Sequence, residues 1–302
     1  MFFSPRLRAI LQALLVTFLW STSWILIKYA LNEIPPLTFA GLRYMMAFII
    51  LLPGLGKHKV EMLALSTKEW RRLAVLGLVF YTMTQGGQFL TLNHLEAVTF
   101  SLLLNFTSVL VAFFGIIALR EVPSRLQWAG IIIFIAGVLV YFFPASRSGE
   151  QVLGLTLAGF TVCTNAAAAV LGRSVNREKA IPPLVVTAIS MGVGATSLLG
   201  IGLAVQGLPP ISPAGWVIIV WLAVVNTALA FTLWNRSLQK LSAVESSIIN
   251  NTMLVQIAVL AWLFLGEQPA LRGVVGLILA TVGILIAHLR PVQRLGVHPP
   301  RD

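Results

Sequence analysis

Ten long apolar stretches follow one another along the chain, and the short segments between them hold most of the charged residues. Each stretch has about 18 to 24 residues, enough to cross the hydrocarbon core of a bilayer as a helix that rises about 1.5 Å per residue. The predicted spans are 9–30, 38–56, 70–90, 97–118, 126–143, 152–172, 182–205, 214–234, 243–264 and 271–289. The pattern predicts an all-α integral membrane protein with ten transmembrane helices.

The second half of the chain repeats the first half at an offset of 146 residues. Residues 70–144 align with 216–290 without a gap, and small, acidic and helix-ending residues recur together with the apolar ones. The matched pairs include Trp70 and Trp216, Ser101 and Ser247, Asn105 and Asn251, Glu121 and Glu267, Gly130 and Gly276, and Gly137 and Gly283. Because five spans are an odd number, the second copy must enter the membrane from the opposite side. We expect two inverted five-helix repeats, at 1–145 and 150–292, followed by a tail at 293–302.

Composition and charge agree with a membrane protein and predict its orientation. Hydrophobic residues make up 58% of the chain and charged residues only 10%, whereas a soluble domain is about a quarter charged. Of the 21 Lys and Arg residues, 17 lie at the termini and in one set of alternate loops, 3 lie in the other set, and Arg43 lies within the second span. This asymmetry predicts cytoplasmic termini and a cytoplasmic tail at 293–302. The same asymmetry accounts for the net charge of +11, so we expect no nucleic-acid partner. We expect a multi-pass protein of a bacterial inner membrane.

Polar side chains within the spans fall on helix faces that predict an internal cavity. An unpaired polar group is costly in hydrocarbon, so such residues should face the bundle interior or a water-filled space. Tyr81, Gln85 and Gln88 stand at i, i+4 and i+7, which is one stripe of a helix. The candidate substrate-binding residues lie on six spans and are Trp20, Ser21, Tyr81, Gln85, Gln88, Ser101, Asn105, Thr164, Asn165, Trp234, Asn250 and Asn251. Amides, hydroxyls and aromatic rings without a full charge suit a neutral or zwitterionic metabolite with apolar bulk.

Several of these residues also have structural explanations. A single Ser or Thr in a membrane helix commonly bonds to its own backbone, and Asn105 with Asn251 could form a hydrogen bond between helices instead of contacting substrate. Arg43 lies close enough to the outer surface for its side chain to snorkel. Glu121 and Glu267 precede prolines, and we expect each to cap the helix that follows it.

The sequence predicts no catalytic, metal or cofactor site. The four histidines, His58, His94, His288 and His298, are scattered over loops and span ends, and Cys163 is the single cysteine. A membrane enzyme would need an acid–base pair, a metal cluster or an activated nucleophile, and a channel would need charged rings or filter-like loops. No carboxylate falls at mid-membrane, which favours facilitated diffusion or exchange over proton coupling.

Short motifs in both halves resemble those of one transporter superfamily. They are Phe18 to Ser23 (FLWSTS), Lys28, Pro36 to Arg43 (PLTFAGLR), Leu95 to Ser101, and Glu121 and Glu267 ahead of prolines. With them the chain resembles the drug/metabolite transporter superfamily, of the ten-helix type with two EamA domains. The resemblance implies inverted repeats around a central cavity lined mainly by the first, third, fourth, sixth, eighth and ninth spans. It also implies export of amino acids or related metabolites.

Two other substrate classes occur on the same fold. The four-helix multidrug branch of this superfamily relies on a glutamate embedded in the first helix, and this chain has none there. A nucleotide sugar or phosphate ester would need at least two basic residues in the cavity, and Arg43 is the only one that lies inside a span and away from its ends. A multidrug or a nucleotide-sugar/phosphate-ester transporter therefore remains the alternative to a metabolite exporter.

Overall fold

The computed structural model describes residues 5–119, 121–122, 124–142, 149–177, 181–238, 240–241, 243–288 and 293–294. The first repeat contains α1 (Pro5–Ala30), α2 (Pro36–Leu55), η1 (Gly56–His58), α3 (Lys59–Leu63), α4 (Thr67–Gly77), η2 (Leu78–Gln85), α5 (Gly86–His94), α6 (Ala97–Leu104), α7 (Phe106–Leu119), β1 (Glu121–Val122) and α8 (Arg125–Phe142). The second contains α9 (Gly149–Arg177), α10 (Pro183–Gln206), α11 (Pro213–Ala223), η3 (Val224–Leu229), α12 (Ala230–Leu238), α13 (Ala243–Leu265) and α14 (Leu271–His288), followed by β2 (Gln293–Arg294).

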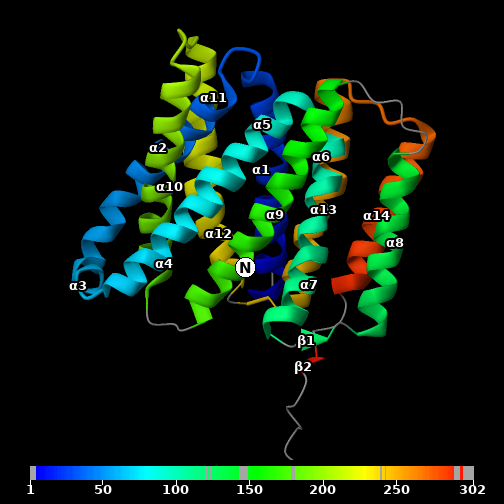
Figure 1. Cartoon of the computed structure of the whole chain (residues 1–302), viewed down its shortest axis with the longest axis horizontal. Coiled ribbons are helices and arrows are strands. Elements are labelled where there is room, and N and C mark those ends of the chain that lie inside the picture. The colour runs from blue at the N-terminus through cyan, green and yellow to red at the C-terminus, as the bar shows by residue number, and fades with distance from the viewer. Residues whose placement is uncertain are drawn as a thin grey trace, which may run out of the picture.

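The helices confirm the predicted all-α membrane fold. Seven helical stretches are long and apolar enough to cross a membrane, and three shorter apolar helices complete the set, at Ala97–Val111, Pro213–Leu229 and Leu271–Ala287. Together they fall on the ten predicted spans. In Figure 1 the helices form one bundle, with α8 and α14 together at one edge. The two short strands β1 and β2 pair in antiparallel fashion, so the start of the predicted tail lies against the loop between α7 and α8.

Glycine contacts show that the two repeats are inverted. A Cβ on Gly130 would lie 2.6 Å from the carbonyl oxygen of Gly283, and one on Gly137 would lie 2.7 Å from that of Gly276. As the residue number rises along α8 it falls along α14, so these equivalent helices are antiparallel. Such close backbone approach through small residues is a common way to pack helices in lipid.

Several other contacts between helices follow the same two-fold relation. Helix α1 packs on α13 and α12, and its counterpart α9 packs on α7, α5 and η2. Helices α2 and α10 pack on each other across the axis. The repeats are therefore intertwined, and each repeat contributes to every interior surface.

Three spans are irregular, and two of the irregularities are equivalent. The segments η2 and η3 are π-helical and begin at Leu78 and Val224, which are 146 residues apart. In each, a threonine hydroxyl donates a hydrogen bond to the carbonyl five residues earlier, from Thr84 to Val79 and from Thr227 to Leu222. The third irregularity lies in the fourth span, where α6 ends at Leu104 and α7 begins at Phe106. π-turns and helix breaks are enriched at functional sites.

Large aromatic side chains fill the centre of the bundle. Phe39, Phe89, Phe100 and Phe134 are fully buried, and the first two rings meet edge to face at 5.0 Å. The outward faces are apolar as well, as at Ile132, because lipid covers them. Because the core and the lipid-facing surface are both apolar, the polar side chains inside the bundle are the ones that distinguish a site.

Candidate functional site

A polar cavity of about 220 Å³ lies between the two repeats near the middle of the membrane-spanning helices. Its walls come from α1, α6, α7, α9 and α13. The lining residues are Trp24, Ser101, Leu104, Asn105, Thr107, Ser108, Asn165, Asn250, Asn251, Met253, Leu254 and Ile257. Five candidates from the sequence, Ser101, Asn105, Asn165, Asn250 and Asn251, are thus brought together. These belong to the fourth, sixth and ninth spans, while no described residue of the predicted third or eighth span lines this cavity.

Two of the asparagines that line this cavity use their amide nitrogens in hydrogen bonds to the protein. Asn165 Nδ2 donates to Thr107 Oγ1 at 3.1 Å, which links α9 to α7, and Asn105 Nδ2 donates to the carbonyl of Ser101 at 2.8 Å. Within the described part of the chain, neither Oδ1 atom accepts a hydrogen bond. The cavity therefore offers two amide oxygens, held by their own amide nitrogens, to a ligand that donates hydrogen bonds.

The break at Asn105 shapes one wall of the cavity. The Asn105 side chain bonds to the Ser101 carbonyl, four residues earlier, while the Asn105 backbone N–H bonds to Leu102, three residues earlier. This local competition with the helical pattern is typical of asparagine. Ends of discontinuous helices at mid-membrane are a recurrent part of transporter binding sites.

Thr107 was missed by the sequence reasoning. It lies off the stripe of Ser101, Asn105 and Ser108 that an unbroken helix would present, and the break at Asn105 turns it toward the cavity. The one indication in the sequence is that Thr107 lies two residues from Asn105. Trp24 covers the cavity as an aromatic wall: it is buried and packs on Phe100 with ring centroids 5.2 Å apart.

Trp20 and Trp234 lie elsewhere, at the junction of α1 with η3 and α12. The Trp20 indole donates to the carbonyl of Asn226 at 3.1 Å, and its ring lies 5.3 Å from Trp234 and 5.4 Å from Phe231. The fully buried Asn226 amide donates to Leu19, and to Ser23 Oγ at 2.9 Å. These contacts tie α1 of the first repeat to η3 of the second.

Ser21 and Thr164 serve helix packing in this structure. Ser21 Oγ lies 2.8 Å from the Thr17 carbonyl and 2.9 Å from Gln256 Oε1, on the interface of α1 with α13. Thr164 Oγ1 donates to the Thr161 carbonyl in its own helix. Both side chains are buried, so a role in substrate binding stays a prediction that would require the helices to move.

The Tyr81 and Gln85 side chains gather around Tyr44 of α2. The Tyr44 hydroxyl donates to Gln85 Oε1 at 2.6 Å, and the Tyr44 and Tyr81 rings meet at 5.4 Å. Gln88 is half-buried on α5. The predicted stripe thus lies inside the bundle and outside the 220 Å³ cavity.

The snorkelling predicted for Arg43 is wrong. Its side chain is only 6% exposed, and both Nε and Nη2 donate to Thr227 Oγ1 at 3.3 Å. The guanidinium also lies 5.1 Å from the centre of the Tyr44 ring. Thr227, whose hydroxyl closes the π-turn of η3, lies close to α2. The Arg43 side chain therefore bonds inside the bundle and links α2 to η3.

Glu267 caps a helix, although not the one predicted. Its two carboxylate oxygens accept hydrogen bonds from the backbone N–H groups of Ala97 at 2.8 Å and Val98 at 3.0 Å. These groups begin α6, in the other repeat, and not α14, which follows Glu267 in the chain. The unpaired N–H groups and the positive end of the helix dipole at the start of α6 attract the carboxylate, which explains why Glu267 caps α6. The side chain of Glu121 lies outside the described residues.

Glu267→Gln tests this contact between repeats. An amide oxygen replaces only one of the two carboxylate oxygens, and the charge is lost, so we expect the free energy of unfolding to fall by about 2 kcal/mol. Thermal unfolding of the purified protein measures the change. Glu150→Gln, at an exposed position in the first turn of α9, should cost only a few tenths of a kcal/mol. Equal effects in the two variants would contradict the capping role.

Glu96, beside this contact, should make stability depend on pH. Burial, and then the negative charge of Glu267, raise the pKa of Glu96 above its ordinary value. The folded protein therefore holds this proton to higher pH than the unfolded chain, and stability is lost as pH rises between the two pKa values. We expect Glu96→Gln to raise the melting temperature at about pH 8 and to change it little at about pH 4. A constant difference across that range would refute the assignment.

Two inverted five-helix repeats around a polar cavity at mid-membrane define a membrane transporter. The model of the EamA-like transporter family matches residues 7–143 and 152–289, once in each repeat, and the chain belongs to this family. It is thus a multi-pass membrane protein with a small-molecule substrate. Among the described residues, no group of three or more His, Cys, Asp or Glu side chains is placed to hold a metal ion.

Curated relatives match along nearly their whole length. An uncharacterized transporter of Archaeoglobus fulgidus is 24% identical over 92% of this chain and 96% of its own length. The uncharacterized transporter YvbV of Bacillus subtilis is 26% identical over 95% of this chain and 93% of its own. The S-adenosylmethionine/S-adenosylhomocysteine transporter of Chlamydia muridarum is 24% identical over 89% and 88%. A crystal structure with a TM-score of 0.68 and 17% identity covers 93% of this chain and 97% of that chain, which shows the same fold.

Proposed function

We propose that the protein is a secondary exporter of small neutral or zwitterionic metabolites such as amino acids. The observation that carries this proposal is the chemistry of the midplane cavity: three hydroxyl groups, four asparagines, Trp24 and four other apolar side chains line it, and none of its described lining residues is charged. Amide oxygens suit an ammonium or hydroxyl group, and the aromatic wall suits an apolar side chain. A phosphate ester or nucleotide sugar would find no cationic partner in the cavity. The cavity therefore suits these substrates less well than a neutral or zwitterionic metabolite.

Alternating access is the mechanism that the inverted repeats support. Helices from both repeats line the cavity, and the contact of Glu267 with α6 joins the repeats at the end where α13 finishes. Opening that end would separate this contact, and opening the other would separate the ion pair between Arg6 at the start of α1 and Glu245 at the start of α13. The substrate would then meet one side of the membrane at a time.

A bacterial plasma membrane with both termini in the cytoplasm is the proposed location. The first helix begins at the same end of the bundle as α13, because Arg6 and Glu245 are in contact. Most basic residues lie in the loops of that end, as the positive-inside rule requires.

Counterflow in proteoliposomes tests the proposal. Vesicles are preloaded with one unlabelled compound, each assayed with its own radiolabelled form, and the first panel contains phenylalanine, threonine and glutamine. S-adenosylmethionine belongs in the panel as well, because the Chlamydia relatives carry that name and the molecule contains an amino-acid group. Saturable accumulation for an amino acid is the expected result. A phosphate ester completes the panel, and accumulation of that compound alone, or flux that does not saturate, would overturn the proposal.

A further inference from the structure

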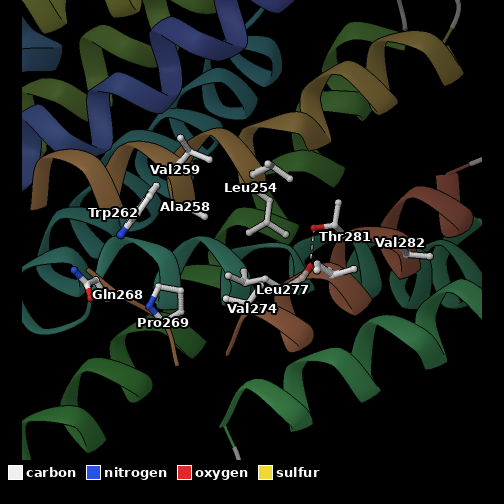
Figure 2. A pocket seen from close by; sticks show the side chains of 12 residues that line it. Leu254, Ala258, Val259, Trp262, Gln268, Pro269, Val274, Leu277, Thr281 and Val282 are labelled. Carbon is white, nitrogen blue, oxygen red and sulfur yellow. Dashed lines mark hydrogen bonds between the residues drawn. The ribbon is translucent and has the colours of Figure 1, made fainter. Parts of the chain in front are cut away.

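A second hollow, larger than the polar cavity, is an apolar groove between α13 and α14. It has a volume of about 550 Å³. Its lining residues are Leu254, Val255, Ala258, Val259, Trp262, Gln268, Pro269, Val274, Leu277, Ile278, Thr281 and Val282. Figure 2 shows Trp262, Gln268 and Pro269 at one end of the groove and Thr281 and Val282 at the other.

The groove exists because α14 packs more closely on α8 than on α13. Backbone atoms of α8 and α14 touch at Gly130, Gly137, Gly276 and Gly283, which leaves no room for side chains there. Between α13 and α14 the chain turns through Gly266, whose φ is +68°, and through Pro269. The side chains of the two helices therefore meet at a distance, and a hollow remains between them.

The groove faces lipid and is polar only at one end. Trp262 is 54% exposed and Ile278 is 57% exposed, on helices that cross the membrane. The Thr281 hydroxyl donates to the Leu277 carbonyl at 2.7 Å and so is already satisfied. Gln268 and the exposed Arg272, in the first turn of α14, lie at the end that reaches the membrane surface, where Trp262 also suits the interface.

The length of the groove matches one leaflet of a bilayer. From Leu271, where α14 begins, to Val282 the helix advances eleven residues, or about 16 Å. The hydrocarbon of one leaflet is about 15 Å thick, half of the bilayer core. An extended acyl chain lying along α14 would fill the groove, with its phosphate level with Arg272 and Gln268, and the cation of Arg272 is complementary to that charge.

We propose that this groove binds one acyl chain of a phospholipid from the leaflet in which α14 begins, the outer leaflet in the orientation given above. Leu254 lines both the groove and the midplane cavity, so its side chain separates the bound chain from the substrate site. The lipid thus forms part of the support for the cavity wall. This site does not depend on which metabolite the protein carries.

Photolabelling in vesicles tests the lipid site. The full-length protein is reconstituted in vesicles of phosphatidylethanolamine and phosphatidylglycerol that contain a small fraction of phosphatidylethanolamine with a diazirine on its acyl chain. After irradiation, the labelled peptides are mapped by mass spectrometry. We expect labels concentrated on 254–262 and 274–282 relative to the other lipid-facing helices. Ala258→Phe, which fills the groove from α13, should lower labelling there by about tenfold.

Matched variants separate groove binding from general lipid contact. Ala136→Phe makes the same change at an exposed position in α8 that does not line the groove, and it should leave the labelling unchanged. Val274→Phe fills the groove from α14 and provides the test if Ala258→Phe does not fold. Even labelling of all lipid-facing helices would overturn the proposal. So would a disulfide between two copies of a Val274→Cys variant in the same vesicles, which would assign the groove to a dimer interface.

Discussion

Asn165→Leu is expected to lower transport by about a hundredfold while the protein still folds and inserts. Asn165 lines the cavity, its amide nitrogen is held by Thr107 at 3.1 Å, and within the described residues its amide oxygen accepts no hydrogen bond. Leucine has a similar volume but no acceptor, so a donor group of the substrate would be buried without a partner, at a cost of about 1 to 3 kcal/mol. Initial rates of counterflow measure the loss.

Asn93→Leu is the matched control, because Asn93 is exposed near the end of α5 and lines no part of the cavity. It should retain the wild-type rate, whereas Asn251→Leu should behave like Asn165→Leu. Gln85→Leu distinguishes the two polar regions of the bundle. If Gln85→Leu abolished transport while Asn165→Leu did not, the binding site would lie at Tyr44 and Tyr81 and not in the cavity.

Gly130→Val is expected to prevent stable folding. A Cβ at residue 130 would lie 2.4 Å from the backbone nitrogen of Ala287 and 2.6 Å from the carbonyl oxygen of Gly283. No side chain can move aside to relieve a clash with backbone, so α8 and α14 must separate. We expect at least about 3 kcal/mol of destabilisation, measured by thermal unfolding and by the yield of monodisperse protein.

The control for this prediction is Gly159→Ala. Gly159 lies within α9 on an exposed face, and a Cβ there would meet nothing within 4 Å. Alanine favours helix over glycine by about 1 kcal/mol, so this variant should be as stable as the wild type or more so. A stable Gly130→Val protein with normal unfolding would contradict the backbone contact of α8 with α14.

The architecture was predictable from the sequence because lipid imposes strong constraints. Ten apolar spans and the repeat offset suffice for the inverted fold, since backbone groups in hydrocarbon must be satisfied within each helix. The repeat matches glycines at 130 and 137 with those at 276 and 283, but the match does not tell that the two helices pack on each other. That pairing depends on how the two-fold axis passes through the bundle.

The candidate site was predictable only in part, because spacing assumes a regular helix. Five predicted residues share one cavity, but Thr107 joins it through a break that Asn105 makes with its own side chain. Trp20 and Ser21 lie within the first span, but position along a helix does not give the direction of a side chain around the helix axis. The partners of Arg43 and Glu267 lie on the other repeat, and a single sequence carries no signal for such pairings.

The π-turns of η2 and η3 bear on the history of the chain. Each wide turn accommodates one residue more than an α-helical turn and rotates everything beyond it, which is costly to introduce into a packed helix. The two turns start at Leu78 and Val224, at the same register of the two repeats. Two independent insertions would rarely reach the same register, so a single ancestral five-helix chain already contained the wide turn.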